Sequence, residues 1–185
     1  MDFFEAYAPD SSRPPLVGVT VREGSSADAV AIGRLIAERN RRPIEDAVRG
    51  VADEIDRLER GLTEKMFCVA ELDGRALGFG RTTMLPCDDI EGARGLPRGW
   101  YLTGVVVEPE FRRRGVGRAL TEFRVNWVAQ RADEIFYYTS AANGASIALH
   151  ADYRELTRDF AFPGLTFAGG VGILYSRALA REFRP

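Results

Sequence analysis

The residues with the clearest chemical potential lie at 105–120, in the stretch VVVEPEFRRRGVGRAL. Apolar residues suited to a buried strand are followed by a helical pattern, and between the two stand Arg112, Arg113, Arg114, Gly115 and Gly117. A helix start exposes about four unpaired backbone N–H groups and the positive end of the helix dipole. Glycines leave this end open, and arginines match phosphate geometry. The pattern favours a diphosphate-binding site, while a tight turn with solvated arginines would show the same sequence.

Two common nucleotide-binding motifs do not fit this turn. A Walker loop requires Gly-Lys-Ser/Thr at the helix start, and the turn contains no lysine. The dinucleotide fingerprint requires a small residue where this chain has Leu120. That fingerprint also follows the first strand of its domain, whereas this turn follows the fourth predicted strand.

A second group of candidate residues lies in the stretch NGASIALHADY, residues 143–153. Asn143 is a suitable N-cap for a helix. His150 is the only histidine of the chain, and an unperturbed imidazole, with a pKa of about 6.5, can donate or accept a proton near neutrality. A histidine on a helix flank without chemical duty would look the same. Other potential acids are Tyr153, Tyr137 and Tyr138.

The elements that position these residues follow from hydrophobic periodicity and turn signals. In the first half of the chain, the pattern predicts a strand at 16–22 and helices at about 26–40 and 43–60. It then predicts a hairpin over 66–85 that turns at Asp73-Gly74, and a central strand at 100–107. The second half predicts a helix at 115–131, a strand at 134–140, a helix at 143–156, and one or two strands within 160–167 and 170–179. The predicted order is β-α-α-β-β-β-α-β-α-β-β.

Length and composition indicate one globular domain. The 185 residues carry a net charge of −2 and are 45% hydrophobic, which disfavours a general nucleic-acid binder. We expect a flexible arm at 1–15, a single domain at 16–185 and a cytoplasmic location, because no signal peptide or membrane span is evident. Cys68 lies in an apolar run and is expected in the core, Cys87 is expected in a loop, and no metal site is expected.

The stretch 105–120 resembles motif A of the GNAT superfamily of acyl-CoA-dependent N-acetyltransferases. The family signature, Arg/Gln-x-x-Gly-x-Gly/Ala after a strand, is matched by Arg112, Gly115 and Gly117. The predicted order of elements over about residues 16–180 also agrees with that family. The resemblance implies an α/β (α+β) fold, with a mixed, mostly antiparallel central sheet of about six to seven strands, a splayed parallel pair and about four flanking helices.

The resemblance also implies the residues that bind the cofactor. In the family, amides of the turn hold the pyrophosphate of coenzyme A, which here implies Arg112, Arg113, Arg114, Gly115, Val116, Gly117 and Arg118. The pantetheine arm enters between the splayed strands and pairs with backbone groups, which here implies Val105, Val106 and Val107. In the family, a backbone N–H also polarises the acetyl carbonyl. One such donor stabilises the oxyanion of the tetrahedral intermediate by roughly 3 kcal/mol. Asn143 and Ser146 match the family motif Asn-x-x-Ala-x-x-Leu-Tyr. The resemblance implies that these two residues face the pantetheine arm.

The catalytic acid is the point where the chain departs from the family. His150 stands at the position of the tyrosine regarded as the proton donor to the departing thiolate, and Tyr153 is a rival acid. The Gly-Phe that usually follows this helix is replaced around Arg154-Glu155. The family often uses a glutamate near the central strands as base, but the strand at 100–107 contains no acid, and Glu108 lies past its end. The candidate bases are Glu71, Asp88, Asp89 and Glu91.

The function implied by the resemblance is transfer of an acetyl group from acetyl-CoA directly to a primary amine of a small molecule or peptide. The acidic stretch at 87–92 would attract a cationic amine, whereas the basic stretch at 39–43 would hold a carboxylate, so the acceptor stays open. The alternative is a non-catalytic acyl-CoA sensor or interaction module of the same fold. We expect no nucleic-acid or membrane partner, and the C-terminal strands would allow a homodimer.

Overall fold

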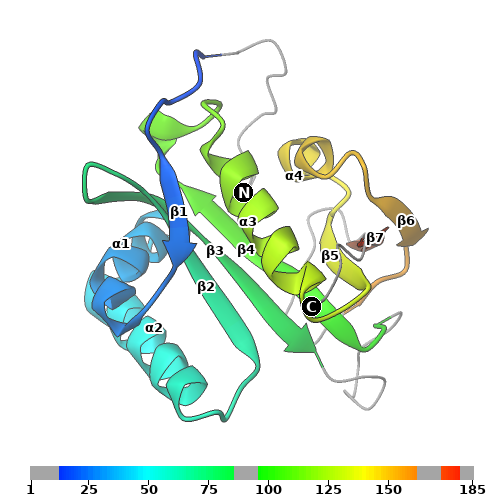
Figure 1. Ribbon diagram of the computed structural model, residues 1–185, viewed down its shortest axis with the longest axis horizontal. Coiled ribbons are helices and arrows are strands. Elements are labelled where there is room, and N and C mark those ends of the chain that lie inside the picture. Colours follow the sequence, from blue (N-terminus) through cyan, green and yellow to red (C-terminus); the bar gives the residue numbers. More distant parts are fainter. Residues whose placement is uncertain (1–12, 86–95, 162–171, 180–185) are drawn as a thin grey trace. The chain divides into compact units, whose positions relative to one another are not determined.

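The computed structural model describes residues 13–85, 96–161 and 172–179, shown in Figure 1. The helices and strands, in chain order, are β1 (Thr20–Glu23), α1 (Ala29–Asn40), α2 (Ile44–Glu59), β2 (Lys65–Leu72), β3 (Arg75–Leu85), β4 (Gly99–Val107), α3 (Val116–Ala129), β5 (Glu134–Ser140), α4 (Gly144–Leu149), β6 (Arg154–Thr157) and β7 (Gly172–Ala178). Short 3₁₀ helices at Ser26–Asp28 and Pro109–Phe111 precede α1 and α3. The order of element types matches the predicted one, although β6 lies at 154–157, where the end of a helix was predicted.

The strands form a mixed seven-stranded sheet in the order β1-β2-β3-β4-β5-β7-β6. β1 with β2, β2 with β3, β5 with β7, and β6 with β7 are antiparallel. β4 and β5 are parallel and pair at Trp100↔Ile135 and Tyr101↔Phe136. α3 is the crossover that a parallel pair requires. The predicted mixed, mostly antiparallel sheet with a parallel pair and four helices is confirmed.

The described residues group into two compact units. Residues 13–83 and 103–124 belong to the first unit, and the described parts of 84–102 and 125–179 belong to the second. β4 and α3 each continue from one unit into the other. Most of the predicted N-terminal arm, the candidate bases at 88, 89 and 91, Cys87, and most of the strand predicted at 160–167 lie outside the described residues.

Side-chain alternation along β2 and β3 builds two apolar layers in the first unit. Phe67, Val69 and Phe79 point to one face, where they pack with buried residues of α1 and α2. Cys68 points to the other face, toward α3, with its Sγ 3.9 Å from the carbonyl oxygen of Leu120. Successive strand residues face opposite sides of a sheet, so helices cover both faces. Cys68 is fully buried, as predicted, and burial raises the pKa of its thiol to about 11.

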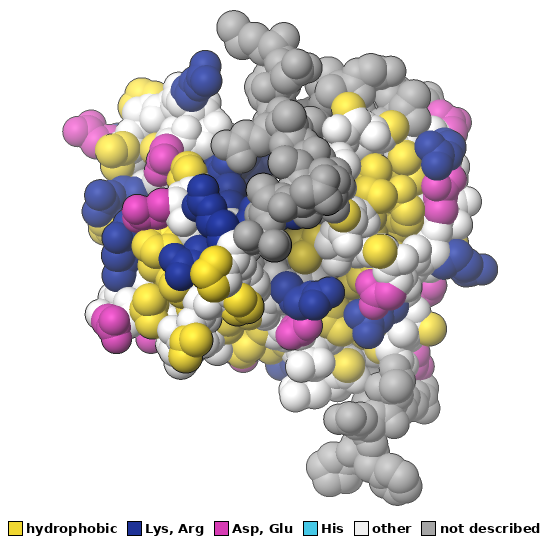
Figure 2. All heavy atoms as spheres, turned by 90° about the horizontal axis from the view of Figure 1, so that it is seen from above, with side chains coloured by type: hydrophobic (Ala, Val, Ile, Leu, Met, Phe, Trp, Pro, Cys, Tyr) yellow, Lys and Arg dark blue, Asp and Glu magenta, His cyan; other side chains and the backbone are white. Residues whose placement is uncertain are grey.

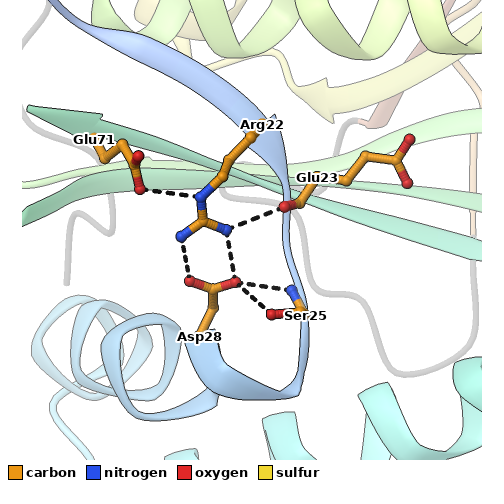
Figure 3. A network of polar contacts seen from close by, with 5 residues as sticks. All are labelled: Arg22, Glu23, Ser25, Asp28 and Glu71. Carbon is orange, nitrogen blue, oxygen red and sulfur yellow. Dashed lines mark hydrogen bonds and ion pairs between the residues drawn. The ribbon is translucent and has the colours of Figure 1, made fainter. Parts of the chain in front are cut away.

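An ion-pair network ties β1 to the start of α1 and to β2 (Figure 3). The guanidinium of Arg22 donates to both carboxylate oxygens of Asp28 at 2.8 and 2.9 Å, and its Nε donates to Glu71 at 3.0 Å. The backbone N–H of Ser25 donates to Asp28 at 2.8 Å, which completes a capping box. The hydrogen bond from Arg22 holds the pKa of Asp28 below its ordinary value despite burial of the carboxylate.

The β2–β3 hairpin turns where the sequence predicts it. Asp73 and Gly74 have φ angles of 50° and 78°. Positive φ at both central residues is the requirement of the type I′ turn, whose twist matches that of the strands. The register pairs Leu72 with Arg75 and Glu71 with Ala76.

The helix predicted at 143–156 is wrong in its second half. α4 ends at Leu149, and the following residues form β6, in which Arg154 pairs with Ser176 and Glu155 with Tyr175. Apolar residues in this stretch have a helical spacing, but hydrogen bonds to β7 override that local preference. The change places two residues of the chemical motif, His150 and Tyr153, in the turn between α4 and β6.

Alternation along β5 places its side chains in two apolar clusters among the described residues of the second unit. Ile135 and Tyr137 pack with Val125 and Val128 of α3. Phe136 packs with Tyr101 and Phe160, and its neighbour Tyr138 stacks on Phe160 at 4.8 Å between ring centroids. Tyr137 and Tyr138 therefore face opposite sides of the strand.

Candidate active site

The end of β4 delivers the chain to the glycine-arginine turn. Val106 is buried among the residues that pack with α1 and α2, whereas Val105 and Val107 are half-buried. The backbone N–H of Glu108 donates to the carbonyl of Leu77 at 2.9 Å. The carbonyl of Val107 accepts a hydrogen bond from Nε of Arg112 at 3.0 Å. The strand end and the first arginine are therefore fixed to each other.

The turn contains two residues in the left-handed region of backbone space. Arg113 has a φ of 62° and Gly115 a φ of 88°. Left-handed residues inside a turn direct neighbouring backbone N–H groups toward one side, where they form an anion-binding concavity. Glycine adopts this conformation freely, but in arginine it costs about 1 kcal/mol or more. The strained Arg113 is consistent with a turn shaped for binding.

The start of α3 presents unobstructed backbone N–H groups. The carbonyl of Gly115 is the first acceptor of the helix, paired with the N–H of Ala119 at 3.0 Å. The N–H groups of residues 116–118 therefore have no acceptor within the helix. A β-carbon on Gly115 would meet no atom of the described residues within 4 Å, and one on Gly117 would only touch Val107 Cγ2 at 3.9 Å. Val116, 2% exposed, anchors this open end to the core.

Segment 13–16 lies against the turn, an arrangement that the sequence analysis missed. Arg114 Nε donates to the carbonyl of Pro14 at 3.2 Å, and the N–H of Leu16 donates to the carbonyl of Arg114 at 3.0 Å. Arg13 Nη1 donates to the carbonyl of Glu110 at 3.1 Å. These partners are about a hundred residues apart, and neither side has a recognisable pairing pattern. Arg118, in contrast, is largely exposed on the first turn of α3.

Asn143 caps α4 in the second unit. Its Oδ1 accepts a hydrogen bond from the N–H of Ser146 at 3.1 Å, the contact expected of an N-cap residue. Asn143 and Ser146 are both half-buried. The predicted capping role is confirmed, whereas a role toward pantetheine stays a prediction.

His150 lies in an aromatic cluster at the end of α4. The imidazole is 4% exposed, stacks on Tyr137 at 4.0 Å between ring centroids, and meets Tyr153 edge-on at 5.1 Å. Its Nδ1 lies 2.8 Å from the carbonyl oxygen of Ser146. Tyr175 stacks on the other side of Tyr137 at 4.7 Å, and burial raises the pKa of Tyr137. Three of the predicted acid candidates, His150, Tyr153 and Tyr137, are thus in mutual contact, and Tyr138 is on the other face.

Comparison with known protein families shows to which family the chain belongs. The family model described as acetyltransferase (GNAT) family matches residues 34–153, well over half of the chain. The protein belongs to the GNAT acetyltransferase family. No curated protein matches the sequence.

Solved structures with the same fold agree with this GNAT assignment. The protein yncA of Salmonella typhimurium, solved with its cofactor acetyl-CoA, is 18% identical with a TM-score of 0.67, and the match covers 91% of this chain and 98% of that one. A ribosomal-protein-alanine N-acetyltransferase from Brucella melitensis is 20% identical with a TM-score of 0.61, over 86% and 99% of the two chains. An aminoglycoside 6′-acetyltransferase type Ii is 17% identical with a TM-score of 0.62, over 90% and 99%. At these identities the likeness establishes the fold.

The turn of this GNAT protein has the features of an anion-binding site. The N–H groups at the start of α3, the missing β-carbons and the left-handed backbone offer what an anion requires at a helix N-terminus. The residues brought together in the first unit are Val107, Arg112, Gly115, Val116 and Gly117. Those brought together in the second unit are Asn143, Ser146, His150 and Tyr153.

Glu71, the one candidate base within the described residues, and Glu108 at the end of β4 are both engaged in ion pairs. Glu71 pairs with Arg22 at 3.0 Å. Glu108 pairs with Arg75, which also pairs with Glu110 at 2.6 Å. These contacts give both carboxylates a structural role on the surface.

Glu54 on α2 is a partly buried acid that the sequence analysis missed. It accepts from Arg81 at 3.0 Å and from Lys65 at 3.2 Å. Burial alone would raise the pKa of Glu54, but the positive charges of Arg81 and Lys65 outweigh it and lower the pKa. The amphipathic pattern locates the helix, but it does not show which side chains of other strands meet this carboxylate.

The described residues contain neither a candidate metal site nor a membrane-spanning helix. No group of three or more His, Cys, Asp or Glu side chains there could hold a metal ion. In the same part of the chain, no helix combines the length and apolar character needed to cross a bilayer.

Proposed function

We propose that the protein transfers an acetyl group from acetyl-CoA directly to a primary amine of a small molecule or peptide. The observation that carries the proposal is the glycine-lined start of α3, where a β-carbon on Gly115 would meet no described atom within 4 Å. The family match adds the reaction class. Neighbours of the same fold are named for a ribosomal-protein alanine and for an aminoglycoside, so the family relationship does not select the acceptor.

Each group of residues has a separate task in this proposal. When bound, acetyl-CoA supplies a thioester whose acyl carbon an amine can attack. The N–H groups of residues 113–118 hold the diphosphate, and the backbone of Val105, Val106 and Val107 orients the rest of the carrier. Asn143 and Ser146 line the pantetheine arm. His150, or Tyr153 in its place, holds the proton that the sulfur requires.

The proposal is tested by filling the space in front of α3. Gly115→Ile adds a branched side chain where the backbone φ is 88°, and it blocks the N–H groups. We expect calorimetric affinity for acetyl-CoA to fall by at least about 100-fold, because several charge-assisted hydrogen bonds are lost. Gly74→Ile, at the exposed hairpin turn with a φ of 78°, is the matched control for backbone strain and keeps the affinity.

The same experiment separates catalysis from simple binding. Thiol release is followed with a panel of primary amines that includes polyamines, amino acids and a peptide with a free N-terminus. Amine-dependent release above the hydrolysis rate supports the proposal. Tight binding of acetyl-CoA with no amine-dependent release would instead indicate the acyl-CoA sensor, and unchanged affinity in Gly115→Ile would refute the role of the turn.

A further inference from the structure

The segment just before β1 is hydrogen-bonded to the residues between β4 and α3 (Figure 1). The backbone N–H of Leu16 donates to the carbonyl of Arg114 at 3.0 Å, and Arg114 Nε donates to the carbonyl of Pro14 at 3.2 Å. Arg13 Nη1 donates to the carbonyl of Glu110 at 3.1 Å. All of these residues belong to the first unit. The segment therefore contacts the loop before α3 at two places along its length.

The strongest of these contacts fall on the residue between the two left-handed positions of the turn. Arg113 has a φ of 62° and Gly115 a φ of 88°. Arg114, between them, is held both by its backbone carbonyl and by its side chain. The strand side of the turn is fixed separately, by the hydrogen bond from Arg112 to the carbonyl of Val107. The segment thus fixes the middle of the turn.

This turn benefits from such support. A left-handed conformation is unfavourable for arginine, because its β-carbon crowds the following carbonyl oxygen, so other conformations of the loop compete with it. The same conformation directs neighbouring N–H groups toward one side, as an anion requires. Hydrogen bonds to Arg114 that form only in this conformation raise its population. A turn that already has its binding conformation also loses less freedom when a ligand binds.

The segment itself is stiff and is connected to the sheet. The rings of Pro14 and Pro15 fix two successive φ angles, and Pro14 is kept extended by the proline that follows it. Gly18 lies against β2, since a β-carbon there would be 3.3 Å from Leu72 Cδ1. β1, which begins at Thr20, then pairs with β2. The sheet therefore sets the position of the segment, and the segment sets the position of the turn.

We propose that segment 13–16 is a positioning element of the cofactor site. Through the Leu16 N–H and the Pro14 carbonyl, it holds Arg114, and with it the glycine-arginine turn, in the conformation that receives the diphosphate of acetyl-CoA. This inference rests on the proposed function, and it adds to the site a part of the chain about a hundred residues away from the turn. Basic side chains also gather on the face of the molecule shown in Figure 2, which suits an anionic ligand.

The first experiment removes the contact without changing the turn. Leu16→Pro lacks the N–H that donates to Arg114. Val17→Pro is the matched control, because Gly18 has a φ of 84° and Val17 is exposed and outside the left-handed region, as in a type II turn, which favours proline at the position of Val17. We expect the calorimetric affinity for acetyl-CoA to fall by about 5-fold to 30-fold in Leu16→Pro, the range of one to two net hydrogen bonds, and to stay unchanged in Val17→Pro.

A donor without the diphosphate distinguishes positioning from a general loss of structure. S-acetylpantetheine carries the same thioester as acetyl-CoA but ends before the diphosphate. With an amine that the unaltered protein acetylates, we expect kcat/KM of Leu16→Pro to fall for acetyl-CoA and to stay unchanged for S-acetylpantetheine. kcat at saturating acetyl-CoA is also kept, because the turn contributes to binding and not to the reaction of the thioester. A variant that has merely lost stability would be slower with both donors.

Arg114→Lys is the second variant, and it decides the question if Leu16→Pro does not fold. Lysine keeps the positive charge but lacks the Nε donor to Pro14. We expect affinity for acetyl-CoA to fall by about 5-fold, the value of one net hydrogen bond, again without a loss for S-acetylpantetheine. Arg34→Lys, at an exposed position on α1, is its control and keeps both. Equal affinities in Leu16→Pro and Val17→Pro, or equal losses with the two donors, would overturn the inference.

Failure of the proposed function would give a different result. If no amine in the panel releases CoA from acetyl-CoA above the hydrolysis rate, acetyl transfer is refuted, while the calorimetric comparison of Leu16→Pro with Val17→Pro still decides whether the segment positions the turn. If the unaltered protein uses S-acetylpantetheine as well as acetyl-CoA, the diphosphate contributes nothing to binding, and the inference falls while acetyl transfer stands.

Discussion

His150 is held in one orientation by contacts on several sides. A backbone carbonyl only accepts hydrogen bonds, so the 2.8 Å contact with Ser146 places a proton on Nδ1. Nε2 is then the ring nitrogen whose protonation can change. Stacking on Tyr137 and the edge contact with Tyr153 restrict rotation of the ring. A proton donor benefits from such restriction, because general acid catalysis requires a fixed geometry.

Replacement of His150 tests this role. Glutamine in His150→Gln can keep a hydrogen bond to the Ser146 carbonyl, but it cannot deliver a proton. We expect kcat to fall by about 100-fold to 10,000-fold, the usual contribution of a general acid, and the corresponding limb of the pH–rate profile to disappear. Tyr153→Phe removes only the rival hydroxyl and is expected to stay within a few-fold of the parent.

Further measurements on the two variants distinguish a catalytic role of His150 and Tyr153 from a merely structural one. Calorimetric affinity for acetyl-CoA and the Tm are measured beside kcat, because loss of packing would lower all three. A normal kcat in His150→Gln together with a large loss in Tyr153→Phe would assign the proton to the tyrosine.

At the level of elements, Arg124 joins α3 to two strands. This buried arginine, 1% exposed, donates from Nη1 to the carbonyls of Arg81 on β3 and Gly104 on β4, at 3.2 and 3.0 Å. Its Nε donates to the carbonyl of Leu120, and Nη2 donates to Thr121 Oγ1. Gly80 makes room for it, since a β-carbon there would lie 2.8 Å from Arg124 Nε. The planar guanidinium suits several acceptors at once.

Arg124→Met removes these hydrogen bonds while keeping most of the side-chain volume. We expect the free energy of unfolding to fall by about 3 kcal/mol, because strand carbonyls are left buried without their donor. Urea denaturation measures the change. Arg60→Met is the matched control: Arg60 is exposed, it pairs with Asp56 one helical turn earlier, and its loss is expected to cost about 0.5 kcal/mol or less. Equal losses in the two variants would contradict the role of Arg124.

Local patterns predicted those elements whose sequence preference agrees with their packing. The hairpin at Asp73-Gly74, the two amphipathic helices α1 and α2, and the strand of β5 at 134–140 were found because turn chemistry and apolar periodicity specify them. β6 was missed because its conformation depends on pairing with β7 rather than on its own residues. The glycines of the turn were recognised by their spacing, which is a local property.

At the level of the whole molecule, long-range contacts are what the sequence analysis could not supply. The order of strands and helices followed from the chain, but the contact of segment 13–16 with Arg114 and the contact of Glu54 with Arg81 join residues distant in sequence. The glycine-arginine turn belongs to the first unit, and His150 belongs to the second. Such groupings depend on the fold, and single-sequence patterns carry little information about them.

The acid stability of the whole molecule depends in part on Asp28. Its pKa is lowered in the folded state, above all by the hydrogen bond from Arg22 shown in Figure 3, so the unfolded chain binds its proton more tightly. The stabilisation is therefore complete above roughly pH 5 and is lost as the pH falls through the folded-state pKa.

Asp28→Asn removes this titration. We expect the variant to be less stable at pH 7 and to lose less stability between pH 7 and pH 3 than the parent, measured as the urea midpoint. Asp53→Asn, an exposed residue on α2, is the control. Parallel pH curves for Asp28→Asn and the parent would show that the Arg22–Asp28 pair does not contribute to the pH dependence.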